Sequence, residues 1–123
     1  MTIQEVIANV VDLMPNQYAT EQKIRWLSTL DGKVFHELIL THCGAETAFF
    51  PPDGYDSDDC ELLVQHPYAD DVYGNYLKSR IAAENNEIIK YDQFAALFNQ
   101  AYNDYTAWYN RTHMPLQHGR WRL

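Results

Sequence analysis

The sequence has few cysteines, few basic residues and no long apolar run, and each shortage argues against a class of protein. Its 123 residues include two cysteines, Cys43 and Cys60, too few for a disulfide framework. Nine lysines and arginines against 17 acidic residues give a net charge of −8, which argues against a general nucleic-acid binder. No apolar stretch approaches the roughly 20 residues that cross a bilayer, and the opening lacks a signal-peptide pattern. We therefore expect no membrane partner and synthesis in the cytoplasm.

The residues that are present favour one folded domain with aromatic surfaces. Apolar residues make up 46% of the chain, and nine tyrosines and three tryptophans are among them. This length and composition predict a single domain over residues 1–123. Tyrosine and tryptophan have an apolar body and a polar tip, so their abundance also indicates surfaces that meet a partner.

Apolar side chains recur at helical spacing in four segments, which predicts an all-α fold of about four helices. The first helix opens on Thr2-Ile3-Gln4-Glu5, a capping-box pattern, and stops at Pro15. Asn85-Asn86 marks a tight turn, so the last two helices should form a long antiparallel hairpin. We expect its core to bury Tyr76, Leu77, Ile81, Phe94, Phe98 and Tyr102. The other expected helix ranges are 20–40 and 87–112, with one helix between Pro67 and the turn.

Residues 42–60 predict a long acidic loop, because prolines, glycines and aspartates follow one another there. Eight carboxylates and no lysine or arginine lie between Glu46 and Asp71. The loop has few apolar side chains to anchor it beyond Phe49, Phe50 and Tyr55. Residues 61–65 are expected to form either one short strand or an extended segment docked on the core. An isolated strand needs a partner, and a neighbouring subunit is one source.

Two kinds of metal site can be drawn around this loop, and both match known motifs poorly. The aspartates of residues 53–59 lack the residue order of a calcium-binding EF-hand. His42, Cys43, Cys60 and His66 have zinc-type side chains, but their spacing matches no common zinc motif. The sequence therefore predicts no cofactor, with these four residues as the alternative metal site.

No catalytic motif is present, so no enzyme activity is expected. The sequence has no Gly-x-Ser-x-Gly turn and no glycine-rich phosphate loop. Cys43 can be paired with His36 or His42 as a dyad. A chain with five histidines offers such pairs by chance.

A distinctive pattern runs through most of the chain outside residues 43–58. It opens with Thr2-Ile3-x-Glu5-Val6-Ile7 and Lys23-x-x-Trp26-Leu27-x-x-Leu30-Asp31. It continues with Glu61-Leu62-Leu63-Val64, Pro67-Tyr68, Tyr73, Tyr76-Leu77, Lys90-Tyr91, Phe98-Asn99 and Trp108-Tyr109-Asn110-Arg111-Thr112-His113-Met114-Pro115. The chain thereby resembles the small head–tail connector proteins of tailed bacteriophages and prophages of Gram-positive bacteria.

The resemblance implies a helical virion protein that forms a homo-oligomeric ring. Such a ring lies between the portal protein and the tail or stopper proteins, and it needs neither catalysis nor a cofactor. DNA passes through it without specific binding, and an acidic chain is compatible with that role because it repels phosphates. The alternative is another small helical phage-encoded module that binds proteins.

Two regions of opposite charge predict how copies of the chain meet. A ring of identical subunits joins one surface to a different surface of the next copy. The acidic stretch of residues 46–71 and the basic end of the chain, which bears Arg111, Arg120 and Arg122 and includes the tail of residues 116–123, are two such surfaces. The candidate interface residues are Asp53, Asp56, Asp58, Asp59, Trp108, Arg111, Arg120, Trp121 and Arg122.

Overall fold

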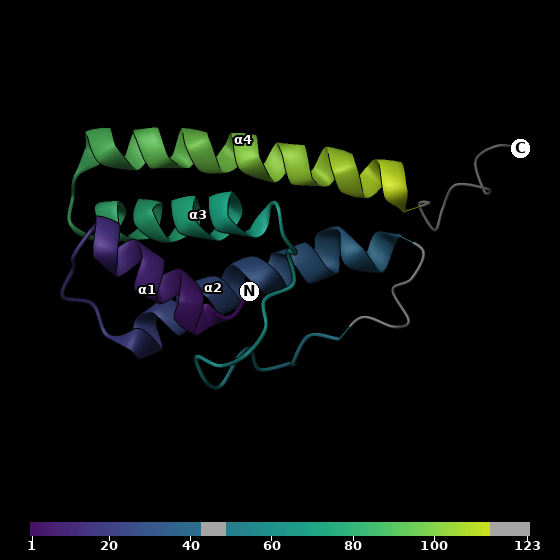
Figure 1. The fold of residues 1–123 in the computed structure, drawn as a ribbon, viewed down its shortest axis with the longest axis horizontal. Coiled ribbons are helices and arrows are strands. Elements are labelled where there is room, and N and C mark those ends of the chain that lie inside the picture. Colours follow the sequence, from purple (N-terminus) through teal and green to yellow (C-terminus); the bar gives the residue numbers. More distant parts are fainter. Residues whose placement is uncertain (43–48, 114–123) are drawn as a thin grey trace, which may run out of the picture.

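The computed structural model describes residues 1–42 and 49–113, and this part of the chain is all-α, as predicted. The candidate tail residues Arg120, Trp121 and Arg122 therefore lie outside the described residues. The elements are α1 (Ile3–Leu13), α2 (Thr20–Glu37), the 3-10 turn η1 (Ile39–Thr41), α3 (Ala69–Glu84) and α4 (Ile88–Thr112). The predicted C-terminal hairpin is confirmed, since α3 and α4 run antiparallel side by side (Figure 1).

Helix α3 lies at the centre of the fold. Helix α4 covers one side of it, and α1 and α2 cover the other (Figure 1). Because α3 is covered on two sides, its buried residues point in several directions instead of forming one stripe. They are Ala69, Val72, Tyr73, Leu77, Ser79, Ile81 and Ala82.

The start of α1 pairs with the end of the acidic loop. The predicted capping box is present, with the Glu5 N–H donating to Thr2 Oγ1 and the Thr2 N–H donating to Glu5 Oε1. The Gln4 N–H donates to the carbonyl oxygen of Asp58 at 2.7 Å, which satisfies a donor that the helix leaves unpaired. Thr2 also forms an antiparallel bridge with Glu61.

This bridge is what remains of the short strand considered for residues 61–65. Its partner is the N-terminal end of the same chain, so no neighbouring subunit is needed. Beyond the bridge the segment bends at Leu63 and Val64 and is docked on the core, where Leu62 and Val64 are almost completely buried. The segment therefore packs as a core element, although it belongs to no helix.

The turn between α3 and α4 has the hydrogen bonds of a Schellman motif. Asn86 adopts a left-handed conformation with φ of 58°, which asparagine tolerates better than most residues. The Asn86 N–H donates to the Ala83 carbonyl at 3.1 Å, and the Glu87 N–H donates to the Ala82 carbonyl at 2.9 Å. These two hydrogen bonds end α3, and α4 begins directly afterwards and runs in the opposite direction.

Two expectations about the helices need correction. Helix α2 ends at Glu37 instead of near residue 40, and the chain continues as η1. Helix α4 is less buried than its aromatic stripe predicts, because α3 is the one helix of the described chain that packs against it. Near the end of α4, Tyr109 and Asn110 also contact His42, which follows η1. Only Tyr105 and Tyr109 are buried in α4. The side chains expected in the hairpin core that prove only partly buried are Tyr76, Phe94, Phe98 and Tyr102.

This difference in burial predicts different costs of truncation in the hairpin. Leu77 is fully buried, so Leu77→Ala should lower the free energy of unfolding by about 3–4 kcal/mol. Phe98 keeps part of its surface in water, so Phe98→Ala should cost about half as much, near 1.5–2 kcal/mol. Urea unfolding followed by circular dichroism measures both values. A larger loss for Phe98→Ala than for Leu77→Ala would contradict the partial exposure of α4.

Candidate functional site

The second half of the acidic loop is anchored on α2 through two of its expected apolar anchors, Phe50 and Tyr55. The Tyr55 N–H donates to Ser28 Oγ at 3.0 Å. Gly54, with φ of 85°, passes so close that a Cβ there would lie 3.2 Å from the Ser28 Cβ. The Phe50 ring packs against Gly32 of α2, where a Cβ would lie 3.6 Å away. Residues 43–48 of the loop lie outside the described residues.

A carboxylate at the centre of the fold organises these contacts. Asp31 of α2 has no exposed surface. Its Oδ2 accepts hydrogen bonds from the Tyr55 hydroxyl at 2.5 Å and the Leu63 N–H at 3.0 Å, and its Oδ1 accepts one from the Tyr73 hydroxyl at 2.6 Å. The Tyr73 hydroxyl in turn accepts from the Val64 N–H at 2.7 Å. One side chain thus joins α2, the loop, residues 61–65 and α3.

The burial of this network changes the protonation chemistry of its members. Burial raises the pKa of the Asp31 carboxyl, and the hydrogen bonds from Tyr55, Tyr73 and Leu63 oppose part of that increase. Burial, together with the neighbouring carboxylate, also raises the pKa of both tyrosines. Perturbed groups often mark active sites. Here the carboxylate is sealed from solvent, so its role is to hold the fold.

The three alternative metal ligands that the structure describes, His42, Cys60 and His66, are not brought together. His42 is buried, with Nδ1 2.7 Å from the Leu38 carbonyl oxygen and Nε2 2.7 Å from Asn110 Oδ1. His66 is exposed, and the Cys60 thiol contacts polar side chains of its own turn. Cys43 lies outside the described residues. Within residues 1–42 and 49–113, no three His, Cys, Asp or Glu side chains lie close enough to share an ion.

The candidate acidic residues of the loop lie at the surface beside α2. Asp53, Asp56 and Asp59 are exposed, whereas Asp58 is partly buried. Asp53 and Asp56 border a shallow hollow of about 290 Å³, together with Arg25 and Glu21 of α2. The basic Arg25 partly offsets the acidic charge there. The loop is therefore less uniformly acidic at its docked end than the sequence alone indicates.

The candidate residues at the end of α4 stand in different environments. Trp108 is partly buried in an aromatic cluster, with its ring centroid 5.6 Å from that of Tyr68 and 5.9 Å from that of Tyr105. Arg111 is exposed. The cluster ties the last turns of α4 to the start of α3. Trp108 thus contributes to the fold even where part of its ring remains at the surface.

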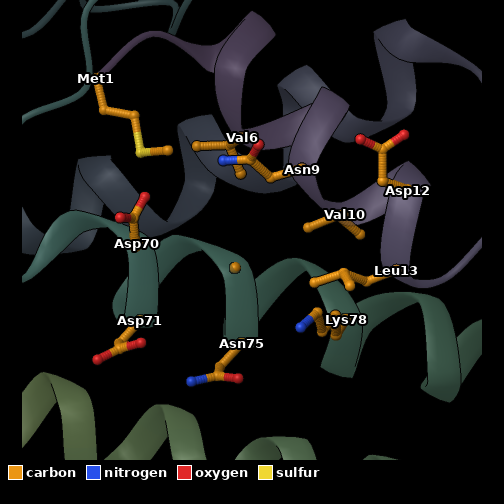
Figure 2. A pocket seen from close by; sticks show the side chains of 11 residues that line it. Met1, Val6, Asn9, Val10, Asp12, Leu13, Asp70, Asp71, Asn75 and Lys78 are labelled. Carbon is orange, nitrogen blue, oxygen red and sulfur yellow. The ribbon is translucent and has the colours of Figure 1, made fainter.

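A groove that sequence reasoning missed lies between α1 and α3. Its volume is about 450 Å³, and its apolar wall comes from Val6, Val10 and Leu13 of α1. Figure 2 shows these side chains facing α3 across the open space. Leu13 is 74% exposed, so the apolar surface reaches the molecular exterior.

Acidic side chains surround this apolar wall. Asp12 comes from α1, and Asp70 and Asp71 come from the first turn of α3 (Figure 2). Lys78 is the one lysine or arginine among the lining residues. The sequence could not reveal the groove because its two walls are separated by about half the chain. The apolar stripe of the first helix gave no signal of it, because periodicity does not show how much of an apolar face is covered.

Comparisons with protein-family models, with curated proteins and with solved structures gave no match to this chain. No helix within the described ranges is long and apolar enough to cross a membrane. A functional proposal for this chain therefore rests on its own residues and their geometry.

The Asp31 network predicts a large and pH-dependent loss of stability on amide substitution. Asp31→Asn places an NH₂ donor among groups that donate, so the free energy of unfolding should fall by about 2–4 kcal/mol. The raised pKa of Asp31 means that the folded state binds its proton more tightly than the unfolded state. The stabilisation that this proton binding contributes is fully present below the pKa that Asp31 has in the unfolded state. It is lost as the pH rises through the pKa of Asp31 in the folded state. The advantage of wild type over Asp31→Asn should therefore be larger at about pH 4 than at about pH 7.

Asp92→Asn on exposed α4 is the matched control, and it should change stability by less than about 0.5 kcal/mol. Urea titrations of the three proteins at both pH values measure these effects. Equal stability of the two variants would show that the buried carboxylate does not hold the fold together.

Proposed function

We propose that this chain is a structural subunit of a phage head–tail connector that assembles as a ring of identical copies. The observation that carries this proposal is the incomplete burial of α4, a 25-residue helix that packs on no helix other than α3 within the described chain. Ile88, Ile89 and Leu97 on this helix are 72%, 75% and 50% exposed. Apolar surface of this kind is stabilised by contact with another protein chain.

The residues behind the family resemblance support the proposal at the level of the fold. Asp31, Leu63, Val64 and Tyr73 belong to the resembling pattern, and together they form the buried hydrogen-bond network. A pattern that includes such a network is expected to accompany a shared fold. The inference from this fold to a connector function is our proposal, and it rests on the exposed apolar side chains of α4.

The overall charge is compatible with a ring through which DNA moves. A net charge of −8 on each copy makes a ring strongly acidic, so the duplex passes without specific binding. The same charge makes copies repel each other at low ionic strength, so apolar contacts must drive their association. In the virion, the portal protein and the tail or stopper proteins would be the neighbours on the two sides of the ring.

A second candidate function is a helical module that binds another phage protein without forming a ring. The groove between α1 and α3 favours this alternative, because it offers one defined concave surface. The oligomeric state separates the two functions. A ring subunit forms a closed oligomer on its own or on the portal, whereas the binding module remains a monomer bound to one partner.

Removal of the gene provides the decisive test in a phage or prophage that encodes this chain. Deletion should yield DNA-filled heads and separate tails, because the joining ring is missing. Electron microscopy of the lysate and plaque counts measure the outcome, and a plasmid copy of the gene should restore joined particles. Tailed, infectious particles from the deletion strain would refute the connector assignment.

The exposed face of α4 can be tested within this system. Leu97→Glu should leave the helical fold intact but reduce incorporation into particles at least about tenfold, because it places a charge in an apolar contact. Gln93→Glu, also exposed on α4, adds the same charge as a control and should be incorporated normally. Quantitative mass spectrometry of purified particles measures incorporation. Equal incorporation of both variants would remove the Leu97 face from the assembly contact.

A further inference from the structure

We propose that the groove between α1 and α3 binds the C-terminal segment, residues 116–123, of a second copy of this chain. This inference deepens the proposed function and rests on it in one respect, namely that copies of the chain assemble. The segment lies outside the described residues, and only its sequence enters the argument. The groove, in contrast, is fully described.

The chemistry of the groove specifies its occupant. Leu13, which is 74% exposed, offers a surface that a large apolar side chain can cover, and Val6 and Val10 line the groove beside it although they are almost completely buried. Asp70 and Asp71 at the mouth favour basic groups on either side of that side chain. An occupant with one large apolar residue between two cations therefore matches both features.

Gly74 gives an independent reason to expect an occupant. It lies in the interior of α3, where glycine destabilises a helix relative to alanine. A Cβ at this position would meet no atom within 4 Å, so no neighbour in the described chain requires glycine. A chain lying across α3 in the groove does require it, because a side chain would project into the space that this chain occupies.

The C-terminal sequence supplies the matching chemistry. Trp121 stands between Arg120 and Arg122, and residues 114–123 contain no acidic residue. Tryptophan and arginine are the side chains that most often dominate protein interfaces. The indole would cover the apolar wall, and the two guanidinium groups would face the aspartates.

A second copy is the occupant that makes this contact useful for assembly. The groove and the segment are different surfaces of one sequence, so each copy can offer its segment to the next copy and its groove to the previous one. Such a heterologous contact repeats around a ring. It also places opposite charges together, which sets the register between subunits that otherwise repel each other.

A peptide-binding experiment tests the groove directly. The probe is a fluorescent synthetic peptide with the sequence of residues 114–123, and the receptor is the full chain carrying Trp121→Ala, so that its own segment does not compete. We expect saturable binding by fluorescence anisotropy, weakened by salt because the charge contacts are screened. A probe with both arginines replaced by glutamine should bind at least about tenfold more weakly.

Position 74 offers a matched pair of receptor variants. Gly74→Leu fills the groove and should weaken peptide binding at least about tenfold, whereas Gly74→Ala should change it by less than about twofold. Both substitutions favour the helix, so loss of folding does not explain a loss of binding. Urea unfolding checks that both variants are at least as stable as the receptor. No saturable binding, or equal binding by the two variants, would overturn the proposal.

Self-association of the wild-type chain tests whether a second copy supplies the C-terminal segment. Sedimentation equilibrium should show a mass that rises with concentration for the wild type and for Gly74→Ala, but not for Gly74→Leu. Asp71→Arg should abolish association, and a combined Asp71→Arg and Arg122→Asp chain should recover it. A wild type that stays monomeric, and binds the peptide only after Trp121→Ala, would place the segment in the groove of its own chain and overturn the second-copy assignment.

These outcomes are distinct from failure of the proposed function. Peptide binding and self-association are measured on purified protein, whereas the connector role depends on the particles formed without the gene. Association through the groove in a protein that tailed particles do not need would preserve this inference and refute the connector.

Discussion

The fold depends on the need to satisfy one buried carboxylate. Removing a charged group from water is costly, and the cost is offset only where hydrogen-bond donors surround it. For Asp31 these donors come from three places in the chain: the loop tyrosine, residues 61–65 and the central helix. All three donors must be in place at the same time. The network therefore favours a single arrangement of α2, the loop, residues 61–65 and α3. This explains how an acidic loop can be packed closely against α2.

The central position of α3 determines which surfaces remain for partners. With α1 and α2 on one side and α4 on the other, α3 is largely covered, and the outer helices keep exposed faces (Figure 1). Two different surfaces result: the exposed surface of α4, which carries Ile88, Ile89 and Leu97, and the acidic groove between α1 and α3. A subunit with two unlike contact surfaces has the geometry that a head-to-tail ring requires. The proposed functions of both surfaces follow from this arrangement.

The candidate site shows how far sequence reasoning reaches. Aspartates 53, 56 and 59 were expected at the surface, and the structure places them there. The groove was not foreseen, because Asp12 and Asp70 come to line the same hollow only when α1 packs against α3. The apolar residues of α1 gave no warning either, since periodicity shows which face is apolar but not how much of that face a partner covers. Gly74 also lies within a helical pattern, and the sequence did not show that the space beside it is open.

The sequence by itself determined the elements that depend on local interactions. The capping box at Thr2, the stop near Pro15 and the turn at Asn86 follow from side chains that interact within a few residues, so the four helices and the hairpin were predictable. Tertiary structure alone decided the burial of Asp31, the partial exposure of Phe98 and the pairing of residue 61 with the chain start. These features depend on contacts between segments far apart in the chain. No local pattern encodes such contacts, because their energies arise only when the helices pack together.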